Sequence, residues 1–238
     1  MIAILKNVLI NNDHEQIPIE LPNNNVEISL FRPTDLSKRE EYFVIARLYE
    51  QSEEAAQTLL NERSQEIFDA INQSGTVEQF FEKNCTMILC HELAKISTET
   101  MLALEEDRYN FKKNVITYTN EEIAGLNSYL SDKGLEKLSN GIINEIINSK
   151  AGESFRNFKS IHTLTSDYYS LVMKLALKLP FITYIPQEQQ LNNLIMDIES
   201  SISESQISLY RQLANSDDTW TDENARPLVE KIWGEKRD

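Results

Sequence analysis

The stretch from Thr76 to Asp107 constrains the fold more than any other part of this chain. Thr76 is a good helix N-cap, because its hydroxyl can accept a hydrogen bond from the free N–H groups of a first turn. Residues 85–90 are apolar on all sides, which is typical of a helix buried among other helices. The pattern therefore predicts a central buried helix over residues 76–107. Its inward face repeats at steps of three and four residues: Val77, Phe80, Phe81, Cys85 and Ile88.

Glycine and proline are scarce, with six of each in 238 residues. A sheet-rich fold needs many turns built from these residues, so their scarcity favours long helices joined by short loops. We predict a mainly α fold, a multi-helix bundle-like body with a short N-terminal β element. Three parts are expected along the chain: an extended β segment at 1–33, a helical body at 34–215 and a tail helix at 216–238.

Further helices are predicted from capping residues and apolar periodicity. Thr34-Asp35 is expected to begin a helix whose apolar face runs through residues 42–49. Ser52 and Thr119, each followed by two acidic residues within the first turn, are expected to begin two more. Residues 109–118 are expected to hold a loop or one short extended piece at residues 115–118, and residues 181–186 a lone strand or a buried linker.

The N-terminal segment alternates apolar and polar residues between turn signals, which predicts short strands. Two or three short strands are not stable alone in water. They must therefore pack on the helical body or pair with another chain by strand addition. Both interpretations remain open. The candidate partner-binding residues of this segment are Val26, Ile28, Leu30 and Phe31.

The C-terminal tail contains both tryptophans of the chain, Trp220 and Trp233. Tryptophan is enriched at the energetically important positions of protein–protein interfaces. Leu228 and Ile232 precede Trp233 at helical steps, so these four residues are a second partner-binding candidate. The alternative, also open, is that the tail helix docks on the body and its indoles complete the core.

No pattern of residues indicates catalysis, a cofactor or a metal. A zinc-protease helix needs a second histidine four residues after His91, and Lys95 stands there. On one helix, Cys85, Cys90 and His91 do not converge on a common ion. Glycine-rich phosphate loops and the nucleophile elbow are absent from the sequence.

Two weaker possibilities for chemistry were weighed. Glu20 and Glu27 are spaced like the carboxylates of a metal-dependent nuclease, but Ser29 stands where that site needs a lysine. An enzyme of another kind would need a deep pocket that gathers distant polar groups such as His91, His162 and Asp167.

The net charge of −15 argues against nucleic-acid binding by this chain, because its surface repels phosphates. The charge suits either a solvated surface or docking on a basic partner. Two cysteines in an apolar stretch suit a reducing cytoplasm. The sequence has neither an opening signal peptide nor an apolar run of about 20 residues, so no membrane association is expected.

The layout resembles the small middle subunits of bacterial three-component defence systems of the Lamassu and ABC-three-component type. The resemblance is carried by residues 31–34, which lead into residues 42–49, and by the acidic helical body that follows. It implies an adaptor that holds an effector, often a nuclease, on an SMC-like (Rad50-like) ATPase, with no catalytic residue of its own. The alternative function is an acidic inhibitor or immunity-type protein that binds a basic target.

Overall fold

The computed structural model describes residues 1–19, 21, 25–160 and 167–186, together with single positions 201, 203, 204, 206, 208, 227 and 230. The chain divides into two compact units, Met1–Gln187 and Glu188–Asp238. Every buried apolar side chain described in the core lies in the first unit. The expected boundaries at residues 33 and 215 stay a prediction.

The first unit is built on a five-stranded mixed sheet with the strand order β1-β2-β3-β4-β5. The first three strands pair antiparallel, whereas β3, β4 and β5 run parallel. The prediction of a mainly α, bundle-like fold is therefore wrong, and this is an α/β fold. The strands are β1 (His14–Ile17), β2 (Val26–Pro33), β3 (Tyr42–Leu48), β4 (Cys85–Glu92) and β5 (Lys112–Tyr118).

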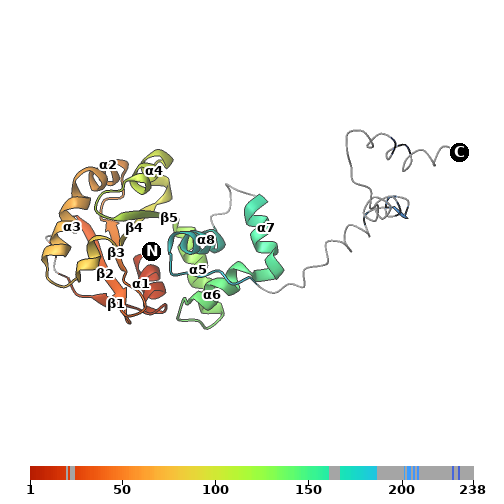
Figure 1. Cartoon of the computed structure of the whole chain (residues 1–238), viewed down its shortest axis with the longest axis horizontal. Helices are drawn as coiled ribbons and strands as arrows, with labels where there is room; N and C mark the ends of the chain where they lie inside the picture. The colour runs from red at the N-terminus through yellow and green to blue at the C-terminus, as the bar shows by residue number, and fades with distance from the viewer. Residues whose placement is uncertain are drawn as a thin grey trace. The chain divides into compact units, whose positions relative to one another are not determined.

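Helices cover both faces of the sheet and make three layers (Figure 1). On one face lie α2 (Glu53–Thr58), the π-helix η1 (Leu59–Arg63), α3 (Ser64–Gln73) and α4 (Thr98–Glu106). On the other lie α1 (Ile2–Ile10), α5 (Asn120–Asp132), α6 (Asn140–Ile147), α7 (Glu153–Ser160) and α8 (Tyr168–Lys178). The 3₁₀ turns are η2 (Gln79–Glu82), η3 (Leu93–Lys95) and η4 (Ser149–Gly152).

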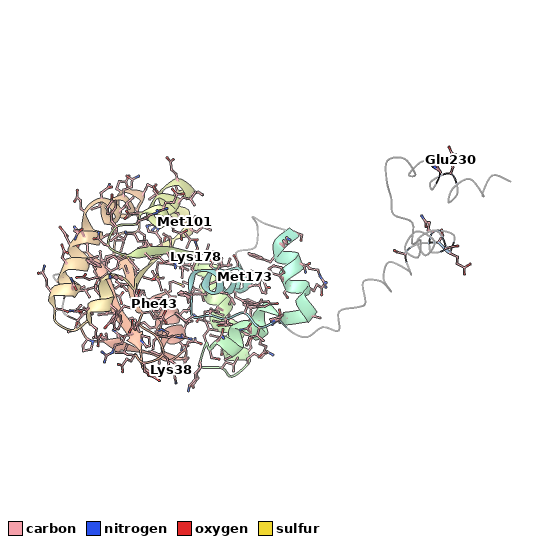
Figure 2. The ribbon with its side chains drawn as sticks, in the orientation of Figure 1. Lys38, Phe43, Met101, Met173, Lys178 and Glu230 are labelled. Carbon is pink, nitrogen blue, oxygen red and sulfur yellow. The ribbon has the colours of Figure 1, made fainter. Side chains whose placement is uncertain are left out.

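Each face of the sheet has its own core, because successive strand residues point to opposite faces. Phe43 and Ile45 of β3 pack in the core beneath α1, α5, α6 and α8, while Val44 packs beneath α2, α3 and α4. Phe43 lies inside the unit, and Lys38 lies at its surface (Figure 2). The alternation continues in β4, where Ile88 and Cys90 face the first core and Met87 and Leu89 face the second.

The predicted central helix over residues 76–107 is wrong. Its apolar centre is strand β4, and only its last part forms an α-helix, α4. A short apolar run suits a buried helix or a fully buried strand equally well, so periodicity alone does not separate them. A parallel strand covered by helices on both faces is apolar along its whole length. The run at residues 85–90 belongs to such a strand.

The helix expected after Thr34-Asp35 is also wrong. Asp35 instead accepts a hydrogen bond from Ser37 N in a tight turn (3.1 Å), and the apolar residues that follow form β3. That segment is rich in aromatic and β-branched residues, which favour strands. Only Arg47 of its seven residues is exposed.

Several local expectations are confirmed. Ser52 caps α2 and Thr119 caps α5, the latter in a capping box with Glu122. The extended piece at residues 115–118 is part of β5, and residues 26–30 lie in β2.

Candidate protein-interaction surfaces

The partner-binding candidates of the N-terminal segment lie in β2. Val26 and Ile28 are half-buried, whereas Leu30 and Phe31 are fully buried and belong to the two different cores. Both edges of β2 are paired, one with β1 and one with β3. β2 therefore offers no free edge to an incoming strand. Contact between these four residues and a partner stays a prediction.

The outer edge of β5 is closed by side chains from α4 and α8. Val115 N donates to Glu105 Oε1 (2.8 Å), and Lys174 Nζ donates to the Thr117 carbonyl (3.1 Å). Asn114 Nδ2 donates to the Lys178 carbonyl (2.6 Å). Such coverage protects an edge strand from pairing with another chain.

The other edge strand of the sheet is β1, and no strand among the described residues pairs with its outer side. Thr34 N donates to the Asp13 carbonyl (2.9 Å) just before the strand begins. Hydrogen bonding alternates along an antiparallel pair, so the amide groups of His14 and Gln16 point away from β2. Strand addition to the N-terminal element would therefore take place on β1, a strand that the sequence analysis did not single out.

The second partner-binding candidate falls in the tail. Trp220, Leu228, Ile232 and Trp233 lie outside the described residues, and their role stays a prediction. The same is true of Glu20 and His162.

The described histidines and cysteines are buried in the two cores. His14 Nδ1 lies 2.7 Å from the Asn12 carbonyl, and the ring packs on Phe43 and Phe181. Cys85 and Cys90 face opposite sides of the sheet. Burial raises the pKa of the Cys90 thiol to about 12, which disfavours the nucleophilic thiolate.

The two other described residues that were candidates for a catalytic site, Glu27 and Asp167, take part in separate structural contacts. Glu27 lies 3.7 Å from Lys6 Nζ and 3.9 Å from an Arg47 guanidinium nitrogen. Asp167 caps α8 by accepting from Ser170 N. Within the described ranges, no group of three or more His, Cys, Asp and Glu side chains is placed to hold a metal ion.

The chain leaves the first unit along an extended segment that an asparagine ladder on α6 holds in place. Asn140, Asn144 and Asn148 recur every four residues, so they lie on one face of the helix. Asn140 Oδ1 accepts from Thr183 N (3.2 Å). Asn144 donates to the Thr183 carbonyl (2.8 Å) and accepts from Ile185 N (2.6 Å), and Asn148 donates to the Ile185 carbonyl (2.9 Å).

This ladder binds the backbone of the segment, and Asn148 Oδ1 also accepts a hydrogen bond from the Tyr184 hydroxyl (3.0 Å). Tyr184 and Ile185 are 55% and 59% exposed. Phe155, on the neighbouring short helix α7, is also exposed. Contiguous exposed apolar surface often marks a protein contact, so the adjacent side chains of Tyr184 and Ile185 are a candidate for one.

A third surface is a groove of about 550 Å³ between α1 and the segment that follows α5. Asn7 of α1 fixes its far wall, because Asn7 Nδ2 donates to the Glu136 carbonyl (2.8 Å) and its Oδ1 accepts from Leu138 N (2.8 Å). The groove has a mixed lining, with Ile4, Leu130 and Leu135 beside polar residues.

The parallel half of the sheet and the helices between its strands have a known relative. Residues 41–150 match the family model of the ABC-three component (ABC-3C) system Middle Component 1. The match confirms the resemblance to a middle subunit of a three-component system. A middle component implies protein partners. No curated protein and no solved structure matches the chain.

The matched range begins at β3 and ends within η4, so α1, β1, β2, α7 and α8 of this chain lie outside it. Strand β1 and the segment at residues 181–186 lie outside the matched range, whereas helix α6 lies within it. No helix among the described residues is long and apolar enough to span a bilayer.

Sequence reasoning missed the asparagine ladder, although its signal is visible. Asparagine at three successive positions four residues apart is unusual on a helix, because asparagine is a poor helix former. Such spacing indicates that the side chains form hydrogen bonds with the backbone of a neighbouring segment.

Proposed function

We propose that this chain is a non-catalytic adaptor, the middle subunit of a cytoplasmic bacterial complex for defence against phage or plasmids. In that complex it would link an SMC-like ATPase to a nuclease effector. The observation that carries the proposal is the family match over residues 41–150, which covers the parallel strands and the helices of one whole layer.

The chemistry of the described residues supports a scaffolding role. Both thiols and the two described histidines, His14 and His91, are buried in the packed interior. The chain also has 38 acidic against 23 basic residues, so its surface repels nucleic acid. In the complex, the partners would bind DNA and this chain would bind the partners.

The test is to co-express the tagged chain with the other components of its own system and to purify the complex at low and high salt. We expect both partners to be recovered at both salt concentrations. We further expect the ATPase and the effector not to co-purify when this chain is left out. Assembly of those two without it would contradict the adaptor role.

A second function, inhibition of a basic target by an acidic surface, is favoured by one observation. Residues 50–107 carry thirteen acidic and three basic side chains. In the same purification, an inhibitor would bring down a single basic protein that is lost at high salt, because ionic strength screens exposed charges.

A further inference from the structure

The negative charge of the first unit is concentrated in one layer. Residues 50–107, which supply α2, η1, α3 and α4, hold thirteen acidic and three basic side chains. Residues 108–186, which supply α5 to α8, hold seven acidic and ten basic ones. The two helical layers of the sandwich therefore differ in the sign of their charge.

Much of this acidic charge is available to a partner. Six carboxylates on the helices and 3₁₀ turns of the layer are exposed and make no ion pair within the described part of the chain. The surface around them is not evenly polar, since Leu102 on α4 is 48% exposed between Glu99 and Glu106. The six are Glu54, Glu62, Glu66, Glu82, Glu99 and Glu106.

A hollow of about 470 Å³ lies in the same layer, between the π-helix η1 and the end of α4. Leu60, Asn61 and Gln65 of η1 and α3 line the hollow, together with Ala103, Asp107, Tyr109 and Asn110 from the end of α4 and the loop after it. Single-turn π-helices are rare and occur frequently at functional sites. Here the buried Ser64 hydroxyl donates to the Leu59 carbonyl (2.7 Å), which ties down the turn beside the hollow.

Tyr109 stands at the rim of this hollow with 79% of its surface exposed. Its loop is nevertheless rigidly held. Lys113, itself buried, donates to the Tyr109 carbonyl (2.7 Å) and to Asp107 Oδ2 (2.5 Å), and Tyr109 N donates to Asp107 Oδ1 (3.2 Å). An exposed tyrosine on a preorganised loop binds a partner at little entropic cost.

We propose that the hollow beside Tyr109 is the docking surface for a basic protein partner. The occupant is a lysine- and arginine-rich segment that carries an apolar anchor. The anchor enters the hollow against Tyr109 and Leu60, and the cations face the surrounding carboxylates. Charge complementarity selects this occupant, because the same field repels nucleic acid and acidic proteins.

The inference rests on the proposed function only for the identity of the partner, so it is tested in two arms. In the first, the full chain is co-purified with the other components of its system. In the second, a synthetic amphipathic peptide of lysine and leucine is titrated into the full chain and followed by fluorescence anisotropy. The peptide arm does not depend on whether the adaptor role is correct.

Two variants and one control decide the outcome. Tyr109→Ala removes the anchor contact, and Glu62→Lys with Glu106→Lys reverses charge beside the hollow. Asp132→Lys with Glu145→Lys makes the same change of charge at exposed positions of the other layer, outside the groove beside α1. We expect each of the first two to weaken binding about tenfold or more, with steeper loss at low salt for the charge variant.

The control should bind like the unaltered chain. Equal loss in the control and the charge variant, or no loss in either variant, would overturn the docking surface. If no component co-purifies but the peptide still separates the variants, the docking surface stands and the adaptor role fails. If components co-purify and neither variant weakens them or the peptide, the adaptor role stands and this surface is wrong.

Discussion

Asn144 is 7% exposed on α6, and its amide binds two backbone groups of the segment that leaves the first unit. We expect Asn144→Ala to lower the free energy of unfolding by about 1–3 kcal/mol, because Thr183 O and Ile185 N lose their partner. Urea denaturation measures the loss, and limited proteolysis should cut near Ile185 sooner.

The matched control is Asn157→Ala on α7, where the side chain is exposed and makes no hydrogen bond within the described residues. Both changes raise helix propensity by the same amount. The same urea midpoint for the two variants would show that the ladder contributes nothing to stability.

The two thiols provide a second prediction at the residue scale. Burial raises the pKa of Cys90 to about 12 and raises that of Cys85 as well, so neither forms thiolate near neutral pH. We expect no alkylation by iodoacetamide in the native protein and labelling of both after denaturation. Mass spectrometry distinguishes the two, and rapid native labelling would mean that the strand β4 opens readily.

At the scale of elements, α2 and α4 are joined by one carboxylate. Glu53 Oε2 accepts from Ser97 N (2.7 Å), and Oε1 accepts from the hydroxyls of Ser97 and Thr100. The Thr100 hydroxyl is the main cause that lowers the pKa of Glu53 below its ordinary value of 4.5, followed by Ser97. Glu53 thus acts as a side-chain cap from one helix to the next.

The lowered pKa sets the direction of a pH effect. A carboxyl whose pKa is lower in the folded state contributes stability above its unfolded pKa of 4.5, and that stability is lost as pH falls through the folded value. We expect the unaltered chain to lose more stability on acidification below pH 4.5 than Glu53→Gln does. Urea titrations at several pH values measure this, and parallel curves would contradict it.

Glu105 supports the edge of β5 in a comparable way. Its carboxylate accepts a hydrogen bond from Val115 N, and Lys178 Nζ donates to both of its oxygens (2.6 Å each). Lys178 is labelled in Figure 2. Glu105→Ala should cost about 1–3 kcal/mol, because it leaves a strand N–H and a cation without their partner. Glu106→Ala, at the exposed neighbouring position, is the control. Hydrogen exchange at Val115 should quicken only in the first variant.

At the scale of the whole molecule, the division of the chain after Gln187 predicts that the first unit folds without the second. All the buried core residues described lie between Ile2 and Phe181. We expect a chain that ends at Gln187 to keep the circular-dichroism spectrum and urea midpoint of that unit. A molten or aggregated product would show that residues 188–238 are needed to complete the core.

The truncation also tests the tail, because both tryptophans are removed with it. If Trp220 and Trp233 grip a partner, the shortened chain stays folded and its complex is weakened. If they complete the fold, stability falls and the complex is lost with it.

The sequence alone determined the features that depend on a few neighbouring residues. The caps at Ser52 and Thr119 satisfy free N–H groups one turn away, so their helices begin where they were predicted. The alternation in residues 26–30 likewise predicted a strand. The organisation of the chain resembles that of a middle subunit, and the family model of such a subunit matches residues 41–150.

Only the tertiary structure decided what depends on residues far apart in the chain. The apolar run at 85–90 is a strand because β3 and β5 hydrogen-bond to both its edges and helices cover both its faces. The same run would satisfy a buried helix, since local periodicity does not record its neighbours. The asparagine ladder and the contacts that α8 makes at the edge of β5 also join residues 37 to 73 positions apart, through contacts that only the folded chain brings together.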